Sequence, residues 1–171
     1  MIFLTGGARS GKSKLAVEMA RGHGGPVRYV ATAEASDDEM ERRIAAHRLD
    51  RPEDWTVIEA PRDLLHAVVD AGEGEFLVVD CITLWISNLM VDHDDGAILE
   101  RVEAVVGALA DRGSVLVVSN EVGSGLVPMD PVGRKFRDLQ GAANQRFAAV
   151  SERAYLVLAG KVLELGTLGA G

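Results

Sequence analysis

The sequence predicts an α/β fold, in which a mostly parallel β-sheet carries helices on both faces and ends in a C-terminal β-hairpin. Two observations predict this fold. Short apolar runs alternate with amphipathic helical segments along most of the 171 residues, which is the pattern of strands joined by crossover helices. The run at residues 76–79 is apolar at every position, as expected of a strand that is covered on both faces.

The expected strands are separated by turn-forming residues and by helical segments. They occupy residues 1–5, 27–31, 55–59, 76–80 and 114–119. Two further apolar runs, at residues 155–158 and 162–165, flank Gly160-Lys161 and predict the terminal hairpin.

The expected helices begin after turns or at sequences that cap a helix. Their starts are Lys12, the capping-box pattern of residues 36–39, Pro61, Thr83, the acidic residues 92–95, and Asp130-Pro131. The second helix is expected to end at Arg51-Pro52, since the residue before a proline avoids helical angles. The helix before Gly113 carries an apolar stripe at Ile98, Val102, Val105, Val106 and Leu109.

Two helices carry further packing expectations. The helix at Pro61 should have this proline in its first turn, with a buried face made of Leu64, Leu65, Val68 and Val69. The last helix contains Gly141, which indicates close packing against a neighbour, and its buried side should be Phe136, Ala143, Phe147 and Val150.

Composition limits the classes of protein to consider. Apolar residues make up 47% of the chain and charged residues 26%, as in ordinary globular domains, and residues 1–171 are expected to form a single domain. The net charge of −8 argues against a general nucleic-acid or membrane-surface binder, and no apolar run is long enough to span a bilayer. Cys81 is the only cysteine, and the first residues enter a strand rather than a signal peptide, so a cytoplasmic setting is expected.

A glycine-rich segment directly follows the first expected strand. It consists of Gly6, Gly7, Ala8, Arg9, Ser10, Gly11, Lys12 and Ser13 and reads G-x-x-x-x-G-K-S, the phosphate-binding loop of P-loop proteins. Backbone N–H groups and the helix N-terminus bind phosphate, Lys12 is expected to reach the outer phosphates, and Ser13 to ligate Mg²⁺. The fold class is therefore a P-loop NTPase of the RecA-like type. The alternative is a glycine-rich turn that matches by coincidence.

Polar residues follow several strands, at the edge where parallel α/β sheets bind ligands. Asp80 ends a buried strand, where P-loop proteins place an acid that holds magnesium; the alternative is a turn aspartate. The other residues in such positions are Thr32, Ala33, Glu34, Glu59, Asn120 and Glu121.

His47 lies on one helical stripe with Met40 and Ile44. The stripe by itself permits a core histidine that is hydrogen-bonded to a carbonyl. It also permits an exposed imidazole, which near neutral pH can attack phosphorus without a separate base.

Several motifs follow one another in a specific order. After the phosphate loop come residues 29–33, 38–40, Arg43-Ile44, His47, residues 51–55, 80–85, Asn88-Leu89, residues 119–128, Arg134, residues 136–138 and Asn144-Gln145. Over nearly its full length the chain therefore resembles the bifunctional adenosylcobinamide kinase/adenosylcobinamide-phosphate guanylyltransferases of cobalamin biosynthesis.

The resemblance implies two reactions on one scaffold. ATP or GTP phosphorylates the aminopropanol hydroxyl of adenosylcobinamide, a corrinoid, and GMP then passes from GTP to the new phosphate through a GMP-histidine. The matching residue is His47, without ambiguity because its neighbour is Ala46. Mg²⁺ at Ser13 and Asp80, together with Lys12, would neutralise the triphosphate and the leaving pyrophosphate. The family forms homo-oligomers, reported as trimers.

The resemblance also implies nucleotide contacts outside the phosphate loop. They fall on Thr32, Ala33, Glu34, Arg48, Leu49, Asp50, Arg51, Glu59 and Asp80. Glu59 is a candidate reader of guanine, or else a strand-end acid in solvent. Arg43 lies near the transferred phosphoryl group or pairs with Glu39. The loop of residues 120–128, with Arg134 and Arg137, contacts either the corrinoid or a neighbouring subunit.

Two other functions remain as alternatives from the residues alone. One is a single-function P-loop kinase for a small molecule, in which His47 is structural. The other is a nucleotide-dependent switch or binding module. Covalent labelling by GTP tagged at the α-phosphate distinguishes the bifunctional enzyme from both.

Overall fold

The computed structural model describes residues 1–35, 37–49 and 51–167, and within these ranges seven strands form one sheet. The strands are β1 (Ile2–Thr5), β2 (Val27–Ala31), β3 (Thr56–Glu59), β4 (Phe76–Asp80), β5 (Val115–Val118), β6 (Arg153–Leu158) and β7 (Lys161–Leu165). Their order is β3-β2-β4-β5-β1-β6-β7, and every pairing is parallel except that of β6 with β7. The expected parallel sheet with a terminal hairpin is confirmed.

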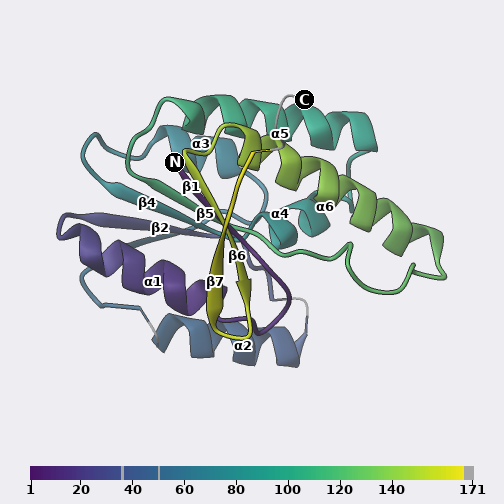
Figure 1. Cartoon of the computed structure of the whole chain (residues 1–171), viewed down its shortest axis with the longest axis horizontal. Helices are drawn as coiled ribbons and strands as arrows, with labels where there is room; N and C mark the ends of the chain where they lie inside the picture. Colours follow the sequence, from purple (N-terminus) through teal and green to yellow (C-terminus); the bar gives the residue numbers. More distant parts are fainter. Residues whose placement is uncertain (36, 50, 168–171) are drawn as a thin grey trace.

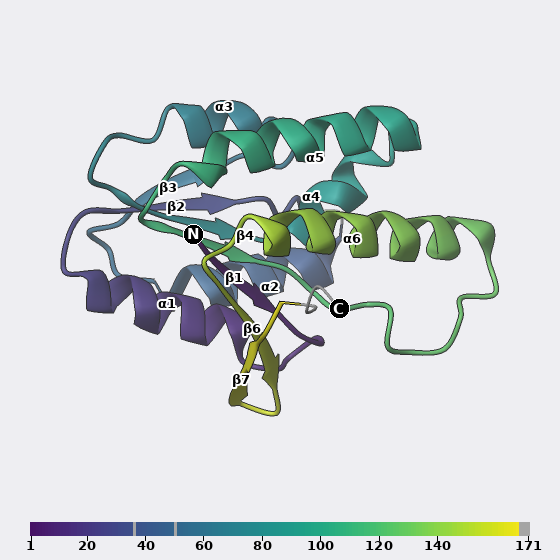
Figure 2. The ribbon, with the colours of Figure 1, turned by 45° about the horizontal axis from the view of Figure 1, so that its top comes forward.

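Helices cover both faces of this sheet, as Figures 1 and 2 show. They are α1 (Lys12–His23), α2 (Asp38–Leu49), α3 (Leu64–Val69), α4 (Ile82–Leu89), α5 (Asp95–Ala110) and α6 (Pro131–Ala149). Helices α3 to α6 lie on one side of the sheet, and α1 and α2 on the other. Within the three described ranges, every helix is too short or too polar to span a membrane.

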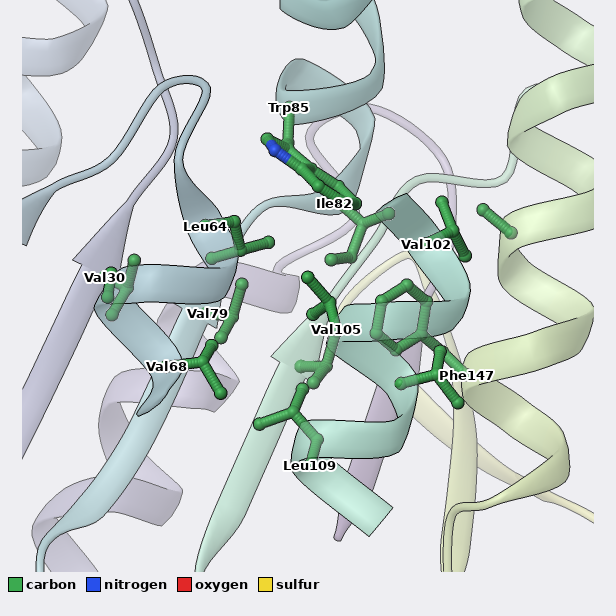
Figure 3. Packing of buried hydrophobic residues seen from close by; sticks show 14 of the residues in the cluster. Val30, Leu64, Val68, Val79, Ile82, Trp85, Val102, Val105, Leu109 and Phe147 are labelled. Carbon is green, nitrogen blue, oxygen red and sulfur yellow. The ribbon is translucent and has the colours of Figure 1, made fainter. Parts of the chain in front are cut away.

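Alternating residues of the central strands enter two separate cores. In β4, Leu77 and Val79 pack under α3 to α6, whereas Phe76 and Val78 pack under α1. Figure 3 shows the first core, where Val79 lies among side chains from α3 and α5. Burial on both sides explains why residues 76–79 of this strand are all apolar. The expected stripe of α5 is buried in full, at Ile98, Val102, Val105, Val106 and Leu109.

The prediction that Pro61 lies in the first turn of a helix is wrong. Helix α3 begins at Leu64, and the side chain of Asp63 caps it by accepting a hydrogen bond from the N–H of His66. The capping carboxylate satisfies a helix N–H that would otherwise lack a partner. The later start also changes the buried face, which is Leu64, Ala67 and Val68, while Leu65 and Val69 are exposed.

Three glycine-based expectations also differ from the structure. A Cβ on Gly141 would meet no atom within 4 Å, so this glycine is not required by close packing. Helix α5 ends at Ala110, before Gly113. The hairpin turn is Ala159-Gly160, one residue earlier than expected, and both residues have positive φ, of 51° and 73°. Such angles at both central positions match the twist of the paired strands.

Candidate active site

The phosphate loop leaves β1 and enters α1 through two glycines with positive φ. Gly6 has φ 151°, and a Cβ at this position would lie 2.1 Å from the carbonyl oxygen of Val157. Gly11, at φ 102°, is the N-cap of α1. Both positions require glycine, because a side chain there would be strained or would clash.

Replacing Gly6 with alanine is therefore expected to displace the loop and to weaken ATP and GTP binding at least tenfold, since roughly 1.4 kcal/mol of distortion already has this effect. Gly7→Ala is the matched control in the same loop, because a Cβ at Gly7 meets nothing within 4 Å. Isothermal titration with each nucleotide measures the effect. Equal affinities for the two variants would contradict the steric argument.

Lys12 is buried, with 6% of its surface exposed, although it carries an ammonium group. Its Nζ donates to the carbonyl oxygens of Gly6 (2.8 Å) and Gly7 (2.7 Å) and to Oγ of Ser10 (3.3 Å). Burial lowers the pKa of Lys12, and the neighbouring Cys81 and Asp80 act in the opposite direction. A cation held in such surroundings interacts with phosphate more strongly than one in water.

Asp80 lies at the carboxyl end of β4, where its Oδ2 accepts a hydrogen bond from the hydroxyl of Tyr29 in β2. Burial, followed by the charge of Asp80, raises the pKa of Tyr29 well above its ordinary value, so the phenol keeps its proton and donates a hydrogen bond to the carboxylate. The guanidinium of Arg51 lies 3.9 Å from the centre of the Tyr29 ring. This chain of contacts links Asp80 to the segment that follows α2.

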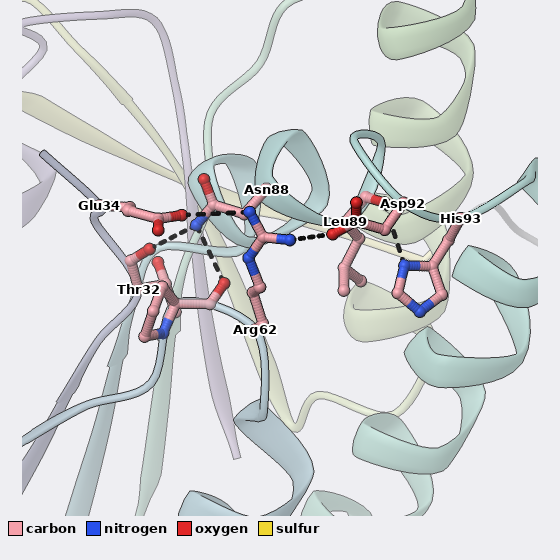
Figure 4. Close-up of polar contacts among 8 residues, drawn as sticks. Thr32, Glu34, Arg62, Asn88, Leu89, Asp92 and His93 are labelled. Atoms are coloured by element: carbon pink, nitrogen blue, oxygen red, sulfur yellow. Dashed lines mark hydrogen bonds and ion pairs between the residues drawn. The ribbon is translucent and has the colours of Figure 1, made fainter. Parts of the chain in front are cut away.

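Thr32 is wholly buried, and its hydroxyl accepts from the N–H of Cys81 (2.8 Å) and donates to the carbonyl of Cys81 (2.7 Å). Figure 4 shows that the side-chain amide of Asn88 donates both to the carbonyl of Thr32 and to that of Pro61, each at 2.9 Å. Nearby, Arg62 forms ion pairs with Glu34 (3.6 Å) and Asp92. These bonds hold the segments that follow β2 and β3 against α4 and the end of β4.

His47 is exposed on α2 rather than buried in a core. Met40, Ile44 and His47, the predicted stripe, all line one cavity of about 1160 Å³. The interpretation of His47 as a core histidine is therefore wrong. The stripe faces this cavity, and neither hydrophobic core includes its residues.

The same cavity brings together most of the predicted site residues. Those that line it are Ala8, Arg9, Ser10, Gly11, Lys12, Ser13, Ala33, Glu34, His47, Arg48, Arg51, Glu59 and Asp80. Gly6, Gly7 and Thr32 are not among the lining residues. Asp50 and the side chain of Leu49 lie outside what the structure describes, as does the side chain of Arg43. Glu59 is exposed and forms an ion pair with Arg48.

Tyr29 and Asn120 also line the cavity, and of these two the sequence assigned no role to Tyr29. The sequence could have indicated a role for Tyr29, because it places a hydroxyl in a buried apolar strand and a buried hydroxyl needs a hydrogen-bond partner. Asn120 was predicted to lie after a strand at the ligand-binding edge and, as part of residues 120–128, to contact the corrinoid or a neighbouring subunit. Its particular surroundings depend on helices that are distant in the sequence.

A phosphate loop after the first strand, and an acid at the end of a parallel strand that lines the same cavity, define a protein of the P-loop NTPase class. Among solved structures, the chain is similar to an ATPase of a type III secretion system of pathogenic bacteria, with a TM-score of 0.54 and 14% identity. The match covers 91% of this chain and 50% of that one, so this chain spans about half its length. At this identity the likeness shows the fold alone.

Comparison of the sequence is more specific. A family model described as cobinamide kinase / cobinamide phosphate guanyltransferase matches residues 2–165, and the chain belongs to this family. It is 41% identical to the bifunctional adenosylcobalamin biosynthesis protein CobP of Pseudomonas aeruginosa, over 95% of each chain. It is 37% identical to the protein CobU of Escherichia coli, over 94% of this chain and 96% of that one.

Membership of this family makes the chain an enzyme with two activities, a kinase and a guanylyltransferase of cobalamin biosynthesis. The relative CobU of Salmonella typhimurium, 37% identical over 94% of this chain, bears the same bifunctional description. Of the three functions that the residues left open, the bifunctional enzyme is the one that the family supports. A kinase alone and a nucleotide-dependent switch are not supported.

Proposed function

We propose that the enzyme first phosphorylates the aminopropanol hydroxyl of adenosylcobinamide with ATP or GTP, and then transfers GMP from GTP to this phosphate through a covalent GMP-His47 intermediate. The observation that carries the proposal is that His47 on α2 and Lys12 of the phosphate loop line the same cavity. A nucleotide held at the loop would thus lie in the space that His47 faces. Exposure of the imidazole allows it to act as a nucleophile.

The second reaction then consists of two displacements at one phosphorus atom. An imidazole nitrogen of His47 bonds to the α-phosphorus of GTP, the bond from this phosphorus to the α–β bridging oxygen breaks, and pyrophosphate leaves with the electron pair. An oxygen of adenosylcobinamide phosphate next bonds to the same phosphorus. The P–N bond breaks, its electron pair returns to the imidazole, and adenosylcobinamide-GDP and free His47 result.

The residues around the cavity suit the remaining tasks. The phosphate loop of residues 6–13 would bind the phosphates through its N–H groups and through Lys12. Nucleotide contacts are proposed for Ala33, Glu34, Arg48, Leu49, Asp50, Arg51 and Glu59, of which those after His47 would shape the pocket for the base and ribose. Thr32 would act indirectly, through its bonds to Cys81. Glu59 would accept from the N1–H and amino groups of guanine, although its carboxylate also pairs with Arg48.

The residues near the loop also fit a magnesium ion. Within the described residues no cluster of three or more histidines, cysteines or acids forms a cage for a metal. Mg²⁺ does not need one, since it commonly binds through one or two protein oxygens, substrate phosphates and water. Ser13 and Asp80 are half-buried, line the cavity and would hold the ion. When bound, Mg²⁺ neutralises charge on the triphosphate.

We further propose that the single domain of residues 1–171 works in the cytoplasm as a homo-oligomer, a trimer by resemblance to the family. Support comes from apolar side chains after β5 that the isolated chain leaves exposed. They include Leu126 (98% exposed) and Met129 (94% exposed), with Val127 and Val132 beside them. Exposed apolar groups gathered on one segment are typical of contact surfaces.

Covalent labelling tests the proposed intermediate. The protein is incubated with magnesium and GTP labelled at the α-phosphate, denatured, and digested. Label should survive base, be lost in acid as expected of a phosphorus–nitrogen bond, and map to the peptide that contains His47. A protein that takes up no label, or label on a different peptide, would remove the GMP-His47 step.

A further inference from the structure

A buried polar cluster lies under the end of β5, between this strand and α6. Ser119 and Gln140 are both wholly buried. The amide nitrogen of Gln140 donates to Oγ of Ser119 and to Oδ1 of Asn144, each at 2.8 Å, and Oγ of Ser119 donates to the same Oδ1 at 2.6 Å. Because burying polar groups costs free energy unless they bond one another, such a cluster holds its members in one arrangement.

The cluster and α4 together fix the backbone of Asn120. The amide nitrogen of Asn144 donates to the carbonyl of Asn120 (3.0 Å), and the N–H of Asn120 donates to Oγ1 of Thr83 (2.7 Å). Both backbone polar groups of this residue are therefore held by side chains from α4 and α6. The side-chain amide of Asn120 is itself half-buried, and in the described part of the chain it makes no hydrogen bond.

The residue after Asn120 shares a hydrogen-bond acceptor with the ammonium group of Lys12. The carbonyl oxygen of Gly6 accepts both from Nζ of Lys12 (2.8 Å) and from the N–H of Glu121 (3.0 Å). In the sheet, β5 lies between β4, which carries Asp80, and β1, which leads into the phosphate loop. Asn120 lines the cavity together with Lys12 and Asp80.

From this geometry we propose that the side-chain amide of Asn120 contacts an oxygen of the outermost phosphoryl group of the bound nucleotide and stabilises that group during transfer in the kinase reaction. The proposal rests on the proposed function, in which the triphosphate lies at the phosphate loop with Lys12 at its outer end. In this step the hydroxyl oxygen of the aminopropanol arm bonds to the γ-phosphorus. The bond from this phosphorus to the β–γ bridging oxygen breaks, the nucleoside diphosphate leaves with the electron pair, and the hydroxyl proton passes to water.

An uncharged amide can fill this role beside the cation that Lys12 supplies. Its NH₂ group can donate a hydrogen bond to a phosphate oxygen, and the backbone that carries it is held at both of its polar groups, so little rearrangement is needed when the charge of the phosphoryl group shifts in the transition state. In the guanylylation of His47 the bond that breaks lies between the α- and β-phosphates. A contact to the outermost group changes little there, so Asn120 should affect the two reactions unequally.

The test compares both reactions in the full chain. Asn120→Ala is expected to lower kcat of the kinase reaction about 100-fold, the usual effect of removing one such donor. Uptake of GMP from α-labelled GTP should stay within about threefold of the parent rate by the same reasoning. Asn120→Asp, which keeps the shape but replaces the donor by an acid beside the phosphates, should lower the kinase reaction at least as far. Gln145→Ala removes an exposed amide from α6 and should change neither reaction.

The outcomes separate this proposal from the function on which it rests. A kinase rate within threefold of the parent in Asn120→Ala, or an equal loss of both reactions, would overturn the role of Asn120 alone. A parent protein that transfers no phosphoryl group to the corrinoid would overturn the proposed function as well. Thermal unfolding of each variant confirms that the fold is intact, as expected since the replaced amide makes no hydrogen bond in the described residues.

Discussion

Replacing His47 with asparagine is expected to abolish formation of adenosylcobinamide-GDP while the kinase reaction continues within about threefold of the parent rate. Without the covalent nucleophile the GMP-enzyme intermediate does not form, and the rate of guanylyl transfer is expected to fall by about 10³-fold or more. The carboxamide of asparagine resembles imidazole in size and polarity, but its nitrogen has no available lone pair. His47 is exposed and outside both cores, so its replacement should not disturb folding.

Chromatography of the corrinoid products measures the two reactions separately. The expected pattern is accumulation of adenosylcobinamide phosphate with no GDP derivative. His66→Asn is the matched control, because His66 is also exposed on a helix but does not line the cavity that contains the phosphate loop. Retained guanylyl transfer in His47→Asn would move the nucleophile to another residue.

Replacing Lys12 with methionine should, by contrast, lower the rates of both reactions, each by about 10³-fold. The reason is that the same cation neutralises phosphate charge in both reactions. Lys12 is buried, and its ammonium group donates hydrogen bonds to the carbonyls of Gly6 and Gly7 in its own loop. The methionine side chain is unbranched and flexible, as the lysine side chain is. Burial disfavours the charged form of Lys12, as its lowered pKa indicates, so removal of the charge offsets part of the cost of losing the hydrogen bonds to Gly6 and Gly7.

Steady-state rates of both reactions, with thermal unfolding beside them, check this prediction. Lys135→Met is the control, because Lys135 lies on α6 and pairs with Asp95 away from the cavity. The two variants therefore give different patterns: His47→Asn separates the reactions and Lys12→Met does not. A Lys12→Met enzyme that still formed GMP-His47 at the parent rate would show that the triphosphate of GTP binds elsewhere during the second reaction.

Much of the site could be predicted because its signals are local. The phosphate loop requires particular residues at adjacent positions, and the strands at residues 27–31 and 76–80 were predicted with the bounds that β2 and β4 have. Asp80 was predicted to follow a buried strand at the ligand-binding edge, and it lines the cavity there. The rule that parallel α/β sheets bind ligands at the carboxyl ends of their strands was enough to place these residues in one site.

Other features could not be predicted from the pattern. Met40, Ile44 and His47 have the spacing of a core stripe, and nothing in that spacing says whether the stripe faces a sheet or a cavity. Similarly, Thr32 was grouped with nucleotide-contacting residues, but its hydroxyl bonds to Cys81 and it is wholly buried. In both cases the environment depends on the packing of segments that are far apart in the chain.

The sequence by itself determined the fold class, the phosphate loop and the family, since each of these is written in residues that are close together or that recur in a specific order. Only the tertiary structure decided which groups meet: Tyr29 with Asp80, Thr32 with Cys81, and Asn120 with Thr83 and Asn144. The physical reason is that hydrogen bonds act over about 3 Å. Which groups come within that range is set by the order of the strands and the packing of the helices, and not by neighbours in the sequence.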